Sequence, residues 1–151
     1  RFEFKGKINQ RIIYDDYAHH PNEIRATIKL GRLFIENKNS KQKSRLVVIF
    51  QPHRFSRVKQ FINEFVKELA KADVIYLTSI FGAGEKNVHN IDSKQIADLI
   101  YKINKNVKYL KNNYEIEDKF LKLTQKNDLI INMGAGDCHN LWSILSKKYS
   151  W

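Results

Sequence analysis

LVVIF, residues Leu46–Phe50, is a run of five apolar residues rich in β-branched side chains. Its length and composition predict a strand that is buried on both faces, as in the middle of a parallel sheet. An amphipathic stretch follows at Ser56–Lys71, where Phe61, Phe65 and Leu69 recur at the four-residue spacing of a helix. A buried strand followed by a helix is the unit from which open α/β sheets are built.

The same alternation continues on both sides of this unit. Further strands are expected at 11–14, 74–77, 107–110 and 129–132, and further helices at 22–35, 93–103, 115–124 and 139–147. This order predicts a single α/β domain with a doubly wound, mostly parallel sheet of about six strands, Rossmann-like in arrangement. The piece Phe2–Phe4, separated by Gly6 from Ile8–Tyr14, is expected to add an edge strand, with antiparallel pairing as one option. The polar stretch Asn37–Ser44 is expected to be a solvated loop.

Length and composition exclude several classes of protein. The 151 residues suit one domain, and no apolar run approaches the roughly 18–20 residues of a membrane span. The single cysteine, Cys138, allows no internal disulfide and fits a reduced, cytoplasmic setting. The chain begins at Arg1 inside a strand-like stretch, which suggests a fragment of a larger protein.

The net charge of +11 has two interpretations. A basic surface attracts nucleic acid or phosphorylated ligands. The other interpretation is compositional bias, because 20 of the 27 basic residues are Lys and they are spread along the whole chain. We favour compositional bias over a nucleic-acid-binding patch.

Four segments do not fit plain secondary structure, and each follows the end of a predicted strand. They are DDYAHHP (Asp15–Pro21), QPHRFSR (Gln51–Arg57), FGAGEKN (Phe81–Asn87) and GAGD (Gly134–Asp137). Ligands of open α/β sheets bind at the carboxyl ends of the strands. The sequence therefore predicts a ligand site that these segments share.

Cations at the start of the second predicted helix are the clearest functional candidates. Arg54 and Arg57 are three residues apart, and guanidinium groups suit carboxylate and phosphate oxygens. A pair of solvated arginines is the alternative, but a cation at a helix start opposes the helix dipole. Binding of an anion is therefore the favoured interpretation.

The other polar residues of these segments have two interpretations each. His19 and His20 contact a ligand or merely precede Pro21 at a helix start, and Asp15 and Asp16 accept bonds from sugar hydroxyls or cap a turn. Tyr17, Glu85 and Asp137 could each contact a ligand or have a structural role only. The same choice applies to His53, although a single histidine is more often structural. Neither glycine motif completes G-x-G-x-x-G, and the chain contains no G-x-x-x-x-G-K-[ST] phosphate loop and no Cys/His cluster with zinc-ligand spacing.

In order and spacing, the four segments resemble the C-terminal domain of the Mur ligases over nearly the whole chain. DDYAHHPNEIRATIK (Asp15–Lys29) and VVIFQPHRFSR (Val47–Arg57) are similar to the branch that joins L-alanine to UDP-N-acetylmuramate. The resemblance implies an N-terminal domain for the UDP-sugar and a central domain for ATP and Mg²⁺, both outside this chain. It also implies a cytoplasmic enzyme of peptidoglycan synthesis that acts through an acyl phosphate, with no nucleic-acid or membrane partner.

The resemblance also implies roles for individual residues. Asp16 is expected to contact the ATP ribose, and Arg57 the alanine carboxylate with charge support from Arg54. His19 is expected to orient or deprotonate the alanine ammonium. Tyr17 and His53 are expected to line the same side of the cleft, and no residue is expected to bind a metal.

Three alternatives compete with this interpretation. A ligase that recycles murein tripeptides shares the His-His-Pro motif but differs at QPHRFSR. A basic, non-catalytic α/β module that binds nucleic acid is the alternative outside the family. A dinucleotide-binding oxidoreductase domain is weak, because the glycine fingerprint is incomplete.

Overall fold

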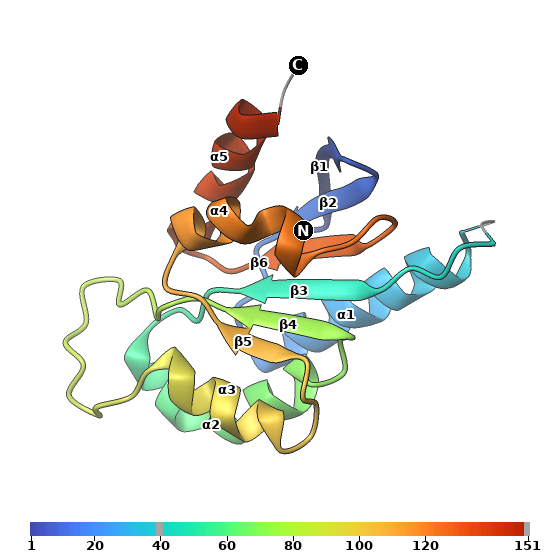
Figure 1. Cartoon of the computed structure of the whole chain (residues 1–151). Helices are drawn as coiled ribbons and strands as arrows, with labels where there is room; N and C mark the ends of the chain where they lie inside the picture. Colours follow the sequence, from blue (N-terminus) through green and yellow to red (C-terminus); the bar gives the residue numbers. More distant parts are fainter. Residues whose placement is uncertain (39–40, 150–151) are drawn as a thin grey trace.

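The computed structural model describes residues 1–38 and 41–149, and these form one sheet covered by helices (Figure 1). The strands are β1 (Glu3–Ile8), β2 (Arg11–Asp16), β3 (Leu46–Phe50), β4 (Val74–Leu77), β5 (Val107–Tyr109) and β6 (Leu129–Met133). The helices are α1 (Pro21–Glu36), α2 (Phe55–Leu69), α3 (Ser93–Tyr101), α4 (Asn113–Leu123) and α5 (Asn140–Tyr149), with a short 3₁₀ turn η1 (Asp137–His139) before α5.

The strand order is β1-β2-β6-β3-β4-β5, and every pair except β1·β2 is parallel. The connections through α1, α2 and α3 all advance in one direction and lie on one side of the sheet. After β5 the chain turns back through α4 and inserts β6 between β2 and β3, so α4 and α5 cover the other side (Figure 1). Right-handed crossovers require this change of side when the winding direction reverses.

The predicted doubly wound, mostly parallel sheet is confirmed. The predicted strands at 46–50 and 74–77 coincide with β3 and β4, and the other predicted strands and helices lie within a few residues of the observed ones. Helix α2 is kinked at Phe61, whose φ of −117° and ψ of 23° are not helical. Of the predicted loop Asn37–Ser44, residues 39 and 40 lie outside the described residues.

The predicted break at Gly6 is wrong. Strand β1 runs through Gly6 with a bulge between Phe4 and Gly6, and the chain turns instead at Asn9 and Gln10, which both have positive φ. Two residues with positive φ form the tight turn of an antiparallel hairpin, which confirms the antiparallel option. Glycine is needed at position 6 for another reason, since a Cβ there would lie 2.4 Å from the Trp142 ring.

Both faces of the sheet are buried, and β3 shows why its sequence is continuously apolar. Leu46, Val48 and Phe50 pack in the core under α1, α2 and α3, whereas Val47 and Ile49 pack in the core under α4 and α5. Fully burying one such side chain stabilises the fold by about 1.5–3 kcal/mol. The alternation leaves no position on this strand for a polar side chain, and Gln51 follows directly after its last residue.

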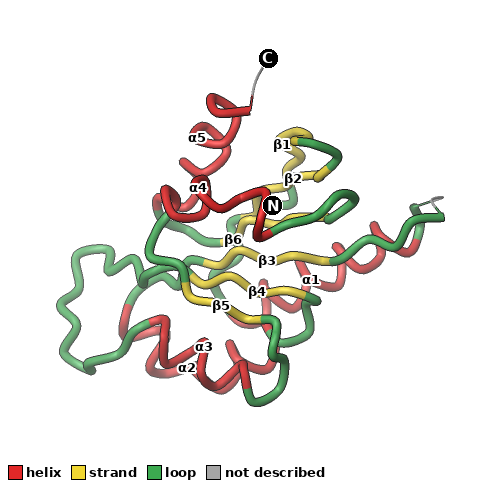
Figure 2. Tube along the Cα trace, viewed as in Figure 1, coloured by secondary structure: helices red, strands yellow, loops and turns green. Residues whose placement is uncertain are grey.

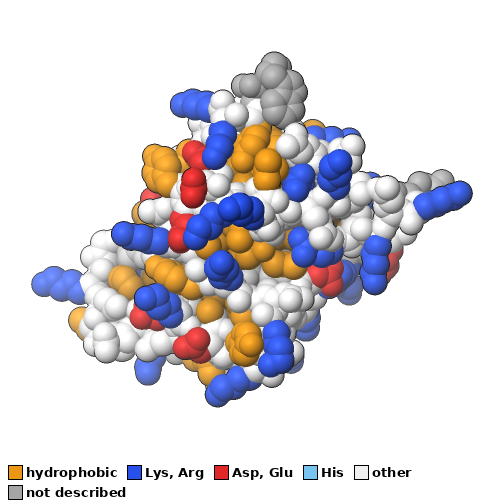
Figure 3. Space-filling model, viewed as in Figure 1, with side chains coloured by type: hydrophobic (Ala, Val, Ile, Leu, Met, Phe, Trp, Pro, Cys, Tyr) orange, Lys and Arg blue, Asp and Glu red, His pale blue; other side chains and the backbone are white. Residues whose placement is uncertain are grey.

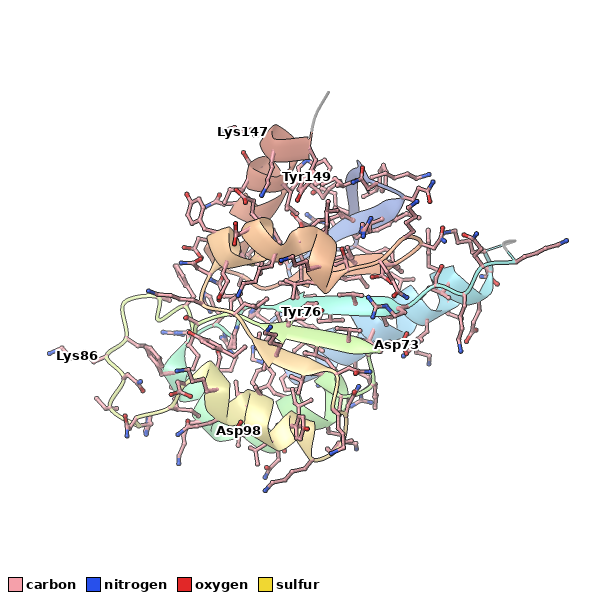
Figure 4. The ribbon with its side chains drawn as sticks, viewed as in Figure 1. Asp73, Tyr76, Lys86, Asp98, Lys147 and Tyr149 are labelled. Carbon is pink, nitrogen blue, oxygen red and sulfur yellow. The ribbon has the colours of Figure 1, made fainter. Side chains whose placement is uncertain are left out.

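Ion pairs anchor the opposite, amino ends of the central strands. Asp128, with 0% exposure, accepts hydrogen bonds from Arg45 Nε at 3.0 Å and Nη2 at 2.8 Å, and from the Gln125 amide at 2.8 Å. Asp73, just before β4 (Figure 4), likewise accepts two hydrogen bonds from the Arg32 guanidinium, one on each carboxylate oxygen. It also accepts the Leu46 amide at 2.7 Å. These carboxylates fix the ends of β3, β4 and β6 away from the carboxyl edge.

Basic side chains are scattered over the surface. On the face drawn in Figure 3, Lys and Arg lie singly among neutral, apolar and acidic side chains and form no continuous stripe. In the described part of the chain, no helix has both the length and the apolar composition needed to cross a bilayer.

We expect Asp128→Ala to lower the free energy of unfolding by about 3–5 kcal/mol, because it leaves Arg45 unpaired and empties a buried acceptor site. Asp98→Ala is the matched control. Asp98 is exposed on α3 (Figure 4), and its loss should change stability by no more than about 0.5 kcal/mol. Urea unfolding followed by circular dichroism measures both. Equal effects would show that Asp128 does not anchor the sheet.

Candidate functional site

The four segments singled out in the sequence do meet at the carboxyl edge of the sheet. Figure 2 shows the loops that leave β3, β4 and β6 gathered on this side of the molecule. Backbone hydrogen bonds join them beyond the strands: Gly134 donates to the Asp16 carbonyl at 3.2 Å, and Gln51 donates to the Met133 carbonyl at 3.0 Å. Phe81 donates to the Pro52 carbonyl at 2.8 Å. The segments therefore form one continuous, backbone-bonded floor.

The insertion of β6 produces two crevices, because the chain leaves β6 toward one face and leaves β2 and β3 toward the other. Such switch points are the usual ligand sites of open α/β sheets. The crevice between β6 and β3 is spanned by Gln51, whose side chain bonds Asp137 Oδ1 at 2.6 Å and the Cys138 amide at 3.1 Å. The crevice between β2 and β6 is open. A pocket of about 560 Å³ lies there, lined by Arg1, Glu3, Lys5, Asp15, Asp16, Tyr17 and His139.

Asp16 lies at the base of this pocket. Its carboxylate is only 5% exposed, and Oδ1 accepts the Ala18 amide at 2.9 Å. The local turn therefore holds one oxygen of a buried carboxylate by a backbone bond. Tyr17, the next residue, is 56% exposed and stacks on the His139 ring, with centroids 5.5 Å apart and planes 5° apart.

Three histidines lie together beside the pocket. The His19 ring is 5.1 Å from the His20 ring and 5.8 Å from the His53 ring, measured between centroids. His19 Nδ1 is 2.8 Å from the Tyr17 carbonyl, which can only accept, so Nδ1 carries the proton and Nε2 is the free acceptor of the neutral ring. His20 is the N-cap residue of α1, and Pro21 begins that helix. Glu23 accepts the amides of both His19 and His20, at 3.1 and 3.0 Å.

Arg57, the last residue of QPHRFSR, binds one of these histidines. Its Nη1 donates to His53 Nδ1 at 3.2 Å and to the His53 carbonyl at 3.1 Å. Burial, followed by the charges of Arg57 and His19, holds the pKa of His53 below its ordinary value. His53 is therefore neutral and accepts at Nδ1. The His53 ring also stacks on Phe81, which ties this motif to the third segment.

Arg54 has a different partner. It is the N-cap residue of α2 with a positive φ of 74°, a backbone conformation uncommon for a side chain of this size, and its amide donates to the Phe81 carbonyl at 2.7 Å. Its guanidinium is paired with Glu85 at 3.6 Å. Glu85 also accepts the Ser56 amide at 3.0 Å and the Ser56 hydroxyl at 2.5 Å, so it supplies the N-terminal cap that Arg54 lacks. These bonds, the hydroxyl first, hold the pKa of Glu85 below its ordinary value.

His139 is the site residue that the sequence did not reveal. Its Nε2 is 2.7 Å from the Gly134 carbonyl, and its Nδ1 is 3.5 Å from Asp15 Oδ2. The Asp15 carboxylate, followed by the Cys138 side chain, raises the pKa of His139 to about 10. The only hint in the sequence was its position two residues after GAGD. It was assigned to the start of the last helix, but η1 turns it toward β2 instead.

Asp137 binds a side chain of the second segment, QPHRFSR. Asp137 is the first residue of η1 and accepts Gln51 Nε2, whereas Gly136 precedes the turn as its N-cap residue. Among residues 1–38 and 41–149, no three His, Cys, Asp or Glu side chains cluster in a way that would hold a metal ion.

Comparisons with known proteins identify one family. The family model of the Mur ligase glutamate ligase domain matches residues 1–136. The UDP-N-acetylmuramate–L-alanine ligase of Prochlorococcus marinus subsp. pastoris is 76% identical over 151 residues, which cover 98% of this chain and 32% of that protein. The chain thus spans about a third of the length of the curated relatives it matches.

Solved structures share the fold. The UDP-N-acetylmuramate-alanine ligase of Thermotoga maritima superposes with a TM-score of 0.69 at 27% identity, over 93% of this chain and 27% of that one. A crystallised domain of a Haemophilus ducreyi protein, described as a UDP-N-acetylmuramate:L-alanyl-γ-D-glutamyl-meso-diaminopimelate ligase, superposes with a TM-score of 0.71 at 21% identity. That match covers 99% of this chain and all of that domain. By its sequence match and its fold, this chain belongs to the Mur ligase family, within the family's C-terminal domain.

Proposed function

We propose that this chain is the C-terminal domain of an ATP-dependent ligase that joins L-alanine to UDP-N-acetylmuramate in cytoplasmic peptidoglycan synthesis. The observation that carries the proposal is the convergence of DDYAHHP and QPHRFSR in one site, where His19, His53 and Arg57 form a continuous cluster. The relatives most similar in sequence bear the name of this ligase, which supports alanine over a murein tripeptide as the added group.

The proposed reaction has two steps. The muramoyl carboxylate attacks the γ-phosphorus of ATP, giving an acyl phosphate and ADP. The alanine amine then attacks the acyl carbon, and the tetrahedral intermediate expels phosphate to leave the amide. Both transition states place negative charge on phosphoryl or carbonyl oxygens, so fixed cations in a dry site stabilise them. Mg²⁺, which the proposal places mainly in the central domain, would neutralise phosphate charge.

His19 and Arg57 are proposed to hold the amino acid. His19 has its Nδ1 proton committed to the Tyr17 carbonyl, which leaves Nε2 as an acceptor for a proton of the alanine ammonium. Only Nη1 of Arg57 bonds to the described residues, so Nε and Nη2 remain as a fork for the alanine carboxylate. The neutral, nearby His53 leaves the charge of Arg57 uncompensated, and that favours binding of an anion.

Asp16 is proposed to accept hydrogen bonds from the ATP ribose hydroxyls. Its Oδ1 is held by the Ala18 amide at the base of the 560 Å³ pocket, and Tyr17 forms the exposed wall beside it. Arg54 is proposed to add positive charge after the first step. In the structure its guanidinium pairs with Glu85, so it reaches the reacting groups only when that pair opens.

Arg57→Lys, in the full-length enzyme, should raise the KM for alanine by roughly tenfold or more, because an ammonium cannot reproduce two parallel bonds to a carboxylate. The KM for ATP should change much less. Steady-state kinetics with each substrate varied measures this, and Arg25→Lys on the exposed surface of α1 is the control. An unchanged alanine KM with a lower kcat would instead assign Arg57 to the transition state.

Asp16→Ala should show the opposite pattern, with a raised KM for ATP and little change in the KM for alanine. The loss of one or two charged hydrogen bonds to ribose corresponds to roughly tenfold or more in affinity. Thermal unfolding of the variant shows whether the turn at Ala18 survives. A folded variant with an unaltered ATP KM would remove Asp16 from the nucleotide site.

The 151-residue chain alone should fold but neither hydrolyse ATP nor join alanine to UDP-N-acetylmuramate. It contains no phosphate-binding loop, and half of a cleft cannot align the reactants. A coupled assay for ADP release, with the full-length enzyme as the positive control, tests this expectation. Turnover by the purified chain above the no-enzyme background would contradict it.

A further inference from the structure

We propose that His139 is a positioning residue of this site: as an imidazolium bound to both Asp15 and the Gly134 carbonyl, it holds the Tyr17 ring and, through Tyr17, His19. This inference rests on the proposed function for its kinetic consequence only. Its structural part, a histidine that keeps its proton well above neutral pH, stands independently of which amino acid the enzyme adds.

The surroundings of the ring require two protons. The Gly134 carbonyl can only accept, so Nε2 must carry a proton at its 2.7 Å separation. Nδ1 faces Asp15 Oδ2 at 3.5 Å, and an unprotonated nitrogen would set a lone pair against a carboxylate. The doubly protonated imidazolium satisfies both partners. The raised pKa of about 10 is consistent with this geometry.

Asp15 is itself held in place for this pairing. It is a buried carboxylate at the end of β2, and its other oxygen accepts Asn132 Nδ2 at 3.3 Å. Asn132, buried on β6, also donates to the Cys138 carbonyl at 2.8 Å, which fixes the turn that carries His139. The side chains of Asp15, Asn132 and His139 therefore connect the carboxyl ends of the adjacent strands β2 and β6.

The consequence for the site passes through Tyr17. This ring is mostly exposed, and the His139 ring stacks on it with its plane nearly parallel. The Tyr17 ring meets the His19 ring edge-on, with centroids 5.8 Å apart, and the Tyr17 carbonyl accepts the hydrogen bond of His19 Nδ1 at 2.8 Å. Holding Tyr17 therefore orients the acceptor nitrogen that we assign to the alanine ammonium. Without the His139 stack, both Tyr17 and His19 would sample more rotamers.

Asp15 on β2 contacts His139 directly, and the adjacent Cys138 side chain adds to the rise in its pKa. The pocket beside the ring is also lined by Asp16 and Glu3, whose carboxylates favour the protonated form, and by the cations Lys5 and Arg1, which oppose it. The folded pKa lies above the value of about 6.5 for an unfolded histidine. Its stabilising contribution is therefore complete below about pH 6.5, declines above it, and is lost as the pH passes about 10.

The direct test follows the His139 imidazole by NMR in the chain of 151 residues, which contains both cores and shares its fold with a domain crystallised alone. We expect the His139 ring to show no titration between pH 6 and about 9. In Asp15→Asn the carboxylate is lost, and His139 should then titrate within that range. A wild-type His139 that titrates near 6.5 would overturn the proposal.

The functional test uses the full-length enzyme. His139→Phe keeps a ring against Tyr17 but removes the bonds to Asp15 and Gly134, and we expect kcat/KM for alanine to fall about tenfold while His89→Phe leaves it unchanged. Asp15→Asn should add a new ionisation to the pH profile, with activity lost as the pH rises through neutrality. Parallel profiles for wild type and Asp15→Asn would refute a role in positioning.

These two tests separate the inference from the proposed function. If the enzyme adds another amino acid, the proposed substrate is wrong, but the NMR result and the extra ionisation in Asp15→Asn are still expected with that amino acid. If His139→Phe does not fold, the Asp15→Asn comparison decides the matter by itself.

Discussion

The insertion of β6 between β2 and β3 is the constraint on which the rest of the structure depends. Its backbone pairs in register with both neighbours, so that Asp16, Met133 and Phe50 end the three strands at one level. Because the strands are parallel, the segments that follow them emerge side by side. Two motifs that are 36 residues apart in the sequence, counted from Asp15 to Gln51, and a third more than 80 residues later thereby become neighbours.

Much of the fold could be predicted because local patterns and the core agree. The apolar run at Leu46–Phe50 is buried on both faces, as its composition requires. The turn at Asn9 and Gln10 could not be predicted in the same way. Neither residue is glycine, whereas Gly6 is conspicuous, yet Gly6 is small because of a tryptophan that lies 136 residues further along the chain. Contacts between distant segments decide such positions, and periodicity contains no information about them.

The candidate site was predicted to a similar extent. Clustering of unusual residues after strand ends placed DDYAHHP and QPHRFSR correctly, since strand ends are visible in the sequence. The sequence did not show which side chains of the site bind one another. Arg54 and Arg57 were expected to act as a pair, but one binds Glu85 and the other His53. His139 could not be identified because it lies in a 3₁₀ turn that begins at Asp137, not in an α-helix, and its ring there meets Asp15 at the end of β2.

The contact between Gly6 and Trp142 links two positions of the chain in evolution. Trp142 occupies the space that any β-carbon at position 6 would need, with ring atoms 2.4 and 2.7 Å from it. A side chain at position 6 therefore requires the Trp142 ring to shift or a smaller residue to replace it, whereas Trp142 can change first without a clash. The order of substitution is therefore asymmetric, with a change at position 142 easing a later change at position 6.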